Sequence, residues 1–263
     1  MISMVGRKKK SGRKPELLGS HQRSWVWGRN LVLEILRAGH WIPHELLLAD
    51  ELEENVREEA RAAANHLNVP VELGTSDRIG QLCQARDHQG LLAKMPPFPY
   101  STLGDIRCAA NSPELFVALD STQDPFNFGA ICRTACAFGA DGILIGQQNQ
   151  VGITSQVARS SAGAITRLKI ARVDDLAEAL RSLTRDGVQT VATAPDSQHS
   201  LSDSDFTMPT AIVIGNEGGG LSPPVRDACG TSVRIPQAAD FDSLNAAVAT
   251  GVILYEVHRQ RHT

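Results

Sequence analysis

Three short motifs in the second half of the chain carry the residues that could take part in chemistry. They read DPFNFGAICRTACAFG (124–139), IVIGNEGGGLS (212–222) and IPQAADFDSLNAAVA (235–249). Each motif contains or follows a short apolar run that is typical of a buried strand. Ligands of open α/β sheets bind at the carboxyl ends of the strands. We therefore expect the three motifs to meet in one site.

The middle motif is a glycine-rich loop that contains one carboxylate. Four glycines lie between Gly215 and Gly220, and glycine lets a ligand approach the backbone closely. The spacing is not that of a dinucleotide-binding fingerprint, and no Walker A lysine follows. A glycine cluster alone is typical of a tight turn. The presence of Glu217 inside the cluster favours a ligand-binding loop over that simpler interpretation.

The two flanking motifs place polar side chains near the starts of helices. Ser243 is the predicted N-cap of the last helix. Asn245 is a poor helix former in the first turn, which indicates another role. Asn127 precedes a helix expected over 129–138 and could cap it. Arg133 interrupts the small apolar residues of that helix, and such an arginine is usually paired with a carboxylate or a ligand phosphate.

The elements that must position these residues alternate between strand and helix. From residue 115 onward, we expect strands at 115–119, 142–145, 168–171, 190–193, 211–214 and 233–235. Such alternation predicts an α/β fold with a parallel sheet and helices on both faces. Residues 24–95 are predicted to form a smaller α/β domain. The prolines at 96, 97 and 99 indicate a linker over 96–112, which leaves 113–263 as the main domain.

Composition and charge narrow the class of protein. The 263 residues are 42% hydrophobic and 21% charged, and no apolar run reaches the ~18 residues of a membrane span. The five cysteines lack zinc-ligand spacing, so no metal is expected, and free thiols without a signal peptide favour the reducing cytoplasm. Residues 1–23 hold seven basic residues and one acid, a net charge of +6, against −9 for the remainder. This arm is either an RNA-backbone contact or a solvated tail.

The order and spacing of the three motifs resemble those of the SpoU (TrmH) family. Its members are S-adenosylmethionine-dependent RNA ribose 2′-O-methyltransferases within the SPOUT superfamily. The resemblance implies a trefoil-knotted main domain with S-adenosylmethionine held in the knot, and an active site shared across a homodimer. It implies catalytic roles for Asn127, Arg133, Glu217, Ser243 and Asn245. It implies cofactor contacts at Thr193, Ala194, Ile214, Gly215, Asn216, Gly219, Ile235, Gln237 and Leu244.

The first domain is similar to the RNA-binding domain of family members that act on ribosomal RNA. The resemblance lies in WVWGRNLVLEILRAG (25–39) and DHQGLLAKM (87–95), and it favours 23S rRNA as substrate. A tRNA ribose methyltransferase and a non-catalytic ribosome-assembly factor are the alternatives. The third motif departs from the family at Gln237, Ala239 and Ala247, where methionine, glycine and serine are usual. Cofactor affinity could be altered by the first two changes.

Overall fold

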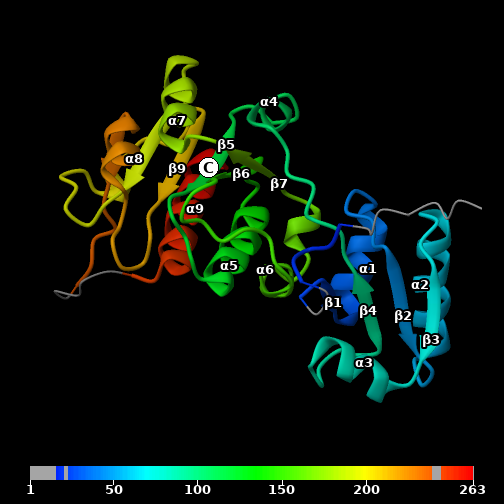
Figure 1. The fold of residues 1–263 in the computed structure, drawn as a ribbon. Helices are drawn as coiled ribbons and strands as arrows, with labels where there is room; N and C mark the ends of the chain where they lie inside the picture. Colours follow the sequence, from blue (N-terminus) through cyan, green and yellow to red (C-terminus); the bar gives the residue numbers. More distant parts are fainter. Residues whose placement is uncertain (1–15, 21–22, 239–243, 263) are drawn as a thin grey trace, which may run out of the picture.

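The computed structural model describes residues 16–20, 23–238 and 244–262 and consists of two α/β domains joined by one segment (Figure 1). Most of the basic arm, residues 1–15 and 21–22, lies outside the described residues. The predicted division into a small first domain and a larger second one is visible in the two separate sheets.

The small domain is built on a four-stranded sheet of order β1-β4-β2-β3. Strand β2 pairs parallel with β3, and β4 pairs antiparallel with both β1 and β2. Its strands are β1 (Trp25–Trp27), β2 (Glu45–Ala49), β3 (Val71–Gly74) and β4 (Leu91–Lys94), and its helices are α1 (Arg29–Ala38), α2 (Glu54–His66) and α3 (Ser76–Cys83). Helix α1 ends at Gly39, whose left-handed φ of 68° suits glycine.

The proline-rich segment is packed against both domains. Phe98 is buried and lies edge-to-face between Trp41 and Tyr100, with ring centroids 5.2 Å from each. The Tyr100 hydroxyl accepts a 2.7 Å hydrogen bond from the backbone N–H of Ile153 in the second domain. The expected linker also contains a short helix, α4 (Leu103–Arg107), with a capping box at Thr102. It therefore restricts how far the domains can move apart.

The second domain contains a six-stranded sheet of order β10-β8-β9-β5-β6-β7, and every recorded pairing is parallel. Its strands are β5 (Leu115–Leu119), β6 (Gly142–Gly146), β7 (Lys169–Val173), β8 (Gln189–Thr193), β9 (Thr210–Ile214) and β10 (Thr231–Val233). Its helices after α4 are α5 (Pro125–Ala137), α6 (Ser155–Ser160), α7 (Leu176–Arg185), α8 (Pro223–Ala228) and α9 (Ala246–Arg261), with short 3₁₀ turns η1 (Ala164–Thr166) and η2 (Leu201–Asp203). The predicted α/β class with a parallel sheet is confirmed.

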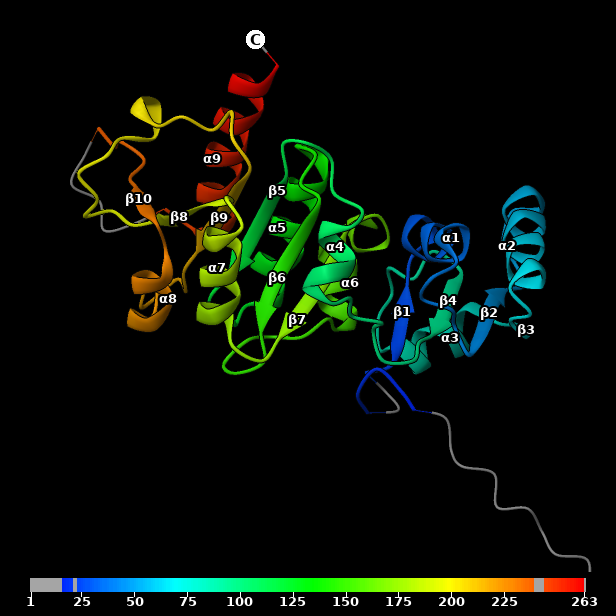
Figure 2. The ribbon, with the colours of Figure 1, turned by 90° about the horizontal axis from the view of Figure 1, so that it is seen from above.

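Helices cover both faces of this sheet, as Figure 2 shows. Strand β5 is buried along its whole length, and its alternate residues enter two different cores. Leu115 and Val117 pack with α5, α6 and α9, whereas Phe116 and Ala118 pack with α4, α7 and α8. The trefoil knot remains a prediction from the family resemblance.

Candidate active site

The glycine loop after β9 is held in shape by side chains from a neighbouring strand end. The carboxylate of Asp120, which directly follows β5, accepts a 2.6 Å hydrogen bond from the backbone N–H of Ser222. The side-chain oxygen Oδ1 of Asn216 accepts hydrogen bonds from the backbone N–H groups of Gly218 and Gly219. A Cβ at Gly215 would lie 2.4 Å from the carbonyl carbon of Gly220, so only glycine fits there. Close backbone approach therefore requires glycine at position 215, whereas at Gly220 a left-handed φ of 66° favours it.

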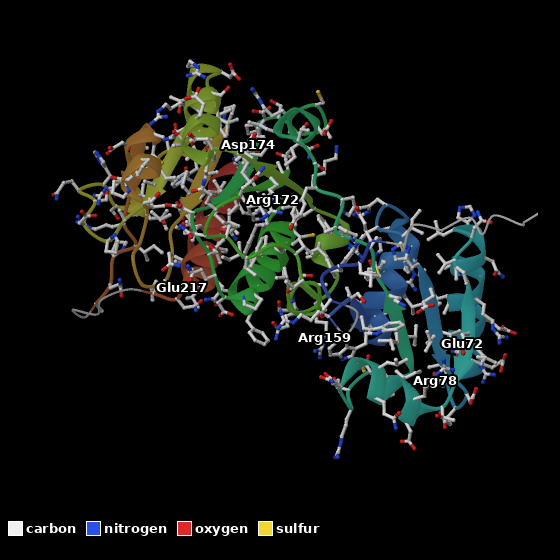
Figure 3. The ribbon with its side chains drawn as sticks, in the orientation of Figure 1. Glu72, Arg78, Arg159, Arg172, Asp174 and Glu217 are labelled. Carbon is white, nitrogen blue, oxygen red and sulfur yellow. The ribbon has the colours of Figure 1, made fainter. Side chains whose placement is uncertain are left out.

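Three of the expected catalytic residues form one hydrogen-bonded chain. Asn245 donates from Nδ2 to Oδ1 of Asn127 at 3.0 Å, and Asn127 donates from Nδ2 to Oε1 of Glu217 at 2.7 Å. These residues come from α9, α5 and the glycine loop. Glu217 is labelled at this end of the domain in Figure 3. Because both polar ends of the Asn127 amide are engaged, its orientation is fixed.

The caps of the two helices differ from the sequence predictions. Asp124 caps α5 by accepting the N–H of Phe126, and Asn127 lies inside the first turn, so it is not the cap. Asn245 caps α9 by accepting from the N–H groups of Ala247 and Val248. The prediction that Ser243 caps this helix is wrong, because α9 begins at Ala246 with Asn245 as its cap. Ser243 itself lies outside the described residues.

Arg133 is exposed, contrary to the expectation that it lies among core residues. Helix α5 buries Phe128, Ile131, Cys132 and Ala135 against the sheet, and Arg133 projects from the opposite side. Its guanidinium makes no hydrogen bond or ion pair with any residue that the structure describes. The small apolar residues around Arg133, such as Gly129 and Ala130, do not indicate from the sequence which face of the helix is buried. An exposed arginine on the same helix as Asn127, with no partner among the described residues, is available to a phosphate.

A cavity of about 560 Å³ lies at the carboxyl ends of β8, β9 and β10. Eight of the nine expected cofactor residues line it; Gly219 does not. The full lining is Thr193, Ala194, Pro195, Ile214, Gly215, Asn216, Glu217, Gly218, Gly220, Val233, Arg234, Ile235, Gln237, Leu244, Ala246 and Ala249. The sequence analysis did not select Asp120, Val233 or Ala249. The position of Asp120 directly after a predicted strand was the only feature of the sequence that indicated a role for it at the site.

The walls of this cavity suit a nucleoside carrying an amino-acid side arm. The volume is within the roughly 300–1,000 Å³ of small-ligand sites. Ile214, Ile235 and Leu244 provide apolar surface. The backbone N–H groups of Ile235 and Gln237 donate to no other described residue and are free to bind a ring nitrogen. The residues therefore fit S-adenosylmethionine.

Two thiols close to the site are unsuited to nucleophilic chemistry. Burial raises the pKa of Cys229 to about 12, with a smaller contribution from the Asp120 carboxylate. Burial also raises the pKa of Cys132, a fully buried residue of α5.

Within the described ranges, no three His, Cys, Asp or Glu side chains are grouped to hold a metal ion. None of the described helices is long and apolar enough to cross a bilayer.

Two family models match the chain, one for each domain. The SpoU rRNA Methylase family matches residues 114–255, and RNA 2′-O ribose methyltransferase substrate binding matches residues 25–101. An uncharacterized tRNA/rRNA methyltransferase of Mycobacterium ulcerans is 38% identical and covers 98% of this chain and 84% of its own. A TrmH family tRNA/rRNA methyltransferase of Bacillus subtilis is 34% identical, covering 92% and 98%.

Solved structures show the same architecture over both domains. The SpoU methyltransferase AviRb from Streptomyces viridochromogenes, in complex with AdoMet, has a TM-score of 0.77 and 28% identity, covering 90% of each chain. An AdoMet-bound rRNA methyltransferase from Sinorhizobium meliloti has a TM-score of 0.79 and 29% identity, covering 91% of this chain and 88% of its own. Both likenesses extend across the small domain and the large one.

Proposed function

Because the chain belongs to the SpoU rRNA methylase family, we propose that it methylates a ribose 2′-hydroxyl of 23S ribosomal RNA. It is an RNA methyltransferase that uses S-adenosylmethionine, as its family does. The observation that carries the finer proposal is the hydrogen-bonded chain of Asn245, Asn127 and Glu217 beside the cavity. Three segments that are distant in the sequence each contribute one side chain to this chain, and these side chains can orient a hydroxyl group.

The cavity at the strand ends is the proposed cofactor site. The N–H groups of Ile235 and Gln237 would bind the base, and Ile214 and Leu244 would enclose it. Bound S-adenosylmethionine supplies an electrophilic methyl group on sulfur. Glu217 both lines the cavity and binds Asn127, so it connects the cofactor site with the substrate site.

The side chains around the cavity would act mainly by positioning. Asn127, held at both ends of its amide, would orient the ribose for in-line attack. Arg133 would bind the adjacent phosphate and stabilise the developing alkoxide. A guanidinium stays protonated in proteins, so we assign Arg133 charge stabilisation and not proton removal. The hydroxyl proton would leave to water or to the RNA phosphate. Ser243, from the same motif as Asn245, is proposed to help orient the ribose.

The small domain supports ribosomal RNA as the substrate. It matches the substrate-binding family model and lies beside the domain that carries the site. A substrate held by both domains must be large enough to span them. The basic arm would add salt-dependent affinity for the RNA backbone.

The outer face of α9 supports a homodimer. Val248, Val252 and Tyr255 recur at helical spacing and are 53%, 39% and 57% exposed. The inner face buries Ile253, Leu254 and Val257, so α9 is apolar on two sides. Exposed apolar side chains that form a contiguous stripe often mark a surface that another protein covers. We propose that a second copy of the chain covers this stripe and completes the active site beside Arg133.

Methyl mapping tests the proposed reaction. We expect rRNA from a strain lacking the gene to lose one 2′-O-methyl group in 23S rRNA, detected by primer extension and mass spectrometry. Calorimetry should show one S-adenosylmethionine site per chain. Loss of a methyl group from tRNA alone would contradict the substrate. Unchanged methylation of all RNA would favour the non-catalytic assembly factor.

A further inference from the structure

The small domain is joined to the methyltransferase domain by a cluster of three side chains, here called the joint. Arg159 of α6 lies over the ring of Trp27 in β1, with its guanidinium carbon 4.1 Å from the ring centroid. The same guanidinium pairs with Oδ2 of Asp87, and Trp27 donates from Nε1 to Oδ1 of Asp87 at 3.0 Å. The three residues thus form a closed set of contacts.

The charges of the joint are balanced within it. The hydrogen bond from Trp27 holds the pKa of Asp87 below its usual range, and the charge of Arg159 acts in the same direction. Arg159 is committed to a ring face and a carboxylate, and its side chain is only 33% exposed. It is therefore poorly placed to bind an RNA phosphate directly. Its contacts favour a role in holding the domains together.

A second contact between the domains lies nearby. Arg167 pairs with Glu34 of α1 at 2.8 Å. A Cβ built at Gly163 would lie 3.4 Å from Cβ of Glu34, so the chain after α6 touches α1 at this point. Arg167 is 65% exposed, so its ion pair with Glu34 is expected to contribute little energy. The close approach at Gly163 offers a place for a covalent link.

The joint is connected to the active site through the adjacent residue. Oγ of Ser160 lies 3.1 Å from the carbonyl oxygen of Pro125, the first residue of α5, and also within hydrogen-bond distance of two carbonyls of its own helix. A Cβ at Gly129 would lie 1.8 Å from Oγ of Ser160, so α5 and α6 cross in direct contact. Asn127 lies between these two contact points. Figures 1 and 2 both show α6 between α5 and β1.

We propose that Arg159 is a positioning residue for methyl transfer. It holds the small domain against α6, so that RNA bound by the small domain reaches the site at Asn127 in the correct place. The inference rests on the proposed function. Its physical basis is that a misplacement of about 1 Å can cost roughly 10²-fold in rate, even when caused far from the reacting atoms. Figure 3 shows Arg159 at the boundary between the domains.

The first test replaces Arg159 in the full-length protein. We expect Arg159→Ala to lower the single-turnover rate at saturating RNA by about 10- to 100-fold. Affinities for S-adenosylmethionine and for RNA should change less than about threefold, since Arg159 does not line the cavity and its guanidinium is paired with Trp27 and Asp87. Asp87→Asn, which keeps an acceptor for Trp27, should give an intermediate rate. Arg78→Ala is the matched control, because Arg78 forms a comparable exposed ion pair with Glu72 away from the joint.

The second test asks whether a covalent link replaces the joint. Glu34→Cys and Gly163→Cys are added to Arg159→Ala, with the exposed Cys108 changed to Ser. The position of Gly163 is close enough to Glu34 for a disulfide. Reduced and oxidised forms of one protein are compared, so any strain from the left-handed φ of 91° at Gly163 is present in both. We expect oxidation to recover most of the lost rate.

Three results would overturn the proposal. They are an unchanged single-turnover rate in Arg159→Ala, a loss confined to RNA affinity, and no recovery on oxidation. All rates are measured on whichever RNA the unaltered protein methylates. Methylation of tRNA alone by the unaltered protein would contradict the proposed substrate, while the ratio of variant to unaltered rates would still test the joint.

Discussion

At the scale of single residues, two side-chain amides hold the polar groups of the site in place. Asn245 both caps α9 and holds Asn127, so one side chain positions a helix and a second side chain. Asn127 in turn holds Glu217 at 2.7 Å. The polar groups are fixed before any ligand binds, which is the arrangement expected of a site that works by positioning.

Arg133 allows charge stabilisation to be tested directly. We expect Arg133→Ala to lower the single-turnover rate by about 10²–10³, the usual effect of removing one electrostatic donor. S-adenosylmethionine affinity should be nearly unchanged, because Arg133 does not line the cavity. Arg133→Lys should recover only part of the rate, since it lacks the planar fork. Arg181→Ala is the control, because Arg181 is an exposed arginine of α7 that does not line the cavity. An unaltered rate in Arg133→Ala would remove Arg133 from the active site.

Asn127 allows the amide chain to be tested. Asn127→Asp cannot donate to Glu217 and places two carboxylates together, so we expect methyl transfer to slow by about 10². Asn111→Asp is a matched control, because Asn111 makes a similar 2.9 Å contact with Asp141 away from the site. The control should alter stability and not the rate per folded molecule. Equal rates in the two variants would refute the role of Asn127.

At the scale of elements, the last turn of α9 is hydrogen-bonded to two segments at the other end of the sheet, 113–114 before β5 and 206–208 before β9. The Arg261 guanidinium donates to the carbonyls of Phe206, Pro113, Glu114 and Met208 at 2.7–3.2 Å. Asn245 caps the opposite end of α9. Helix α9 therefore spans the domain from its fastening point to the candidate site.

Removing this fastening should destabilise the fold. We expect Arg261→Ala to lower the free energy of unfolding by about 1.5–3 kcal/mol, because charge-assisted hydrogen bonds to four carbonyls, three of them in part-buried contacts, are lost. Arg261→Lys should recover little, since one ammonium group cannot reach four carbonyls. Urea unfolding followed by circular dichroism gives the measurement. Arg185→Ala, at a last-turn arginine of α7 that pairs with Glu178, should change stability by less than about 1 kcal/mol.

At the scale of the whole molecule, the proposed dimer covers the apolar stripe of α9. We expect Tyr255→Glu to shift the protein toward monomer in sedimentation and to reduce methyl transfer, because a charge would be buried in the interface. Met208→Glu is the control, as Met208 is 54% exposed and lies outside the stripe. Retention of a dimer by Tyr255→Glu, with full activity, would place the interface elsewhere.

The sequence by itself determined the order of the elements and most of the cavity. Buried strands that are followed by glycine or polar residues can be recognised in the sequence. Burial requires apolar runs, and close backbone approach requires glycine. Gly215 is an example, because a Cβ there would collide with the backbone of Gly220. The individual residues that line the cavity, such as Ile214 and Ile235, were expected from the resemblance to the SpoU family.

Only the tertiary structure decided which faces and which distant residues meet. The exposure of Arg133 depends on how α5 is rotated about its axis against the sheet. The small residues around Arg133 in the sequence do not indicate that rotation. Asn245 was placed one turn inside a helix that in fact begins after it. The joint of Arg159, Trp27 and Asp87 unites residues from two domains. Contacts between such distant segments leave no periodic pattern in a single sequence, because they are set by the packing of complete elements.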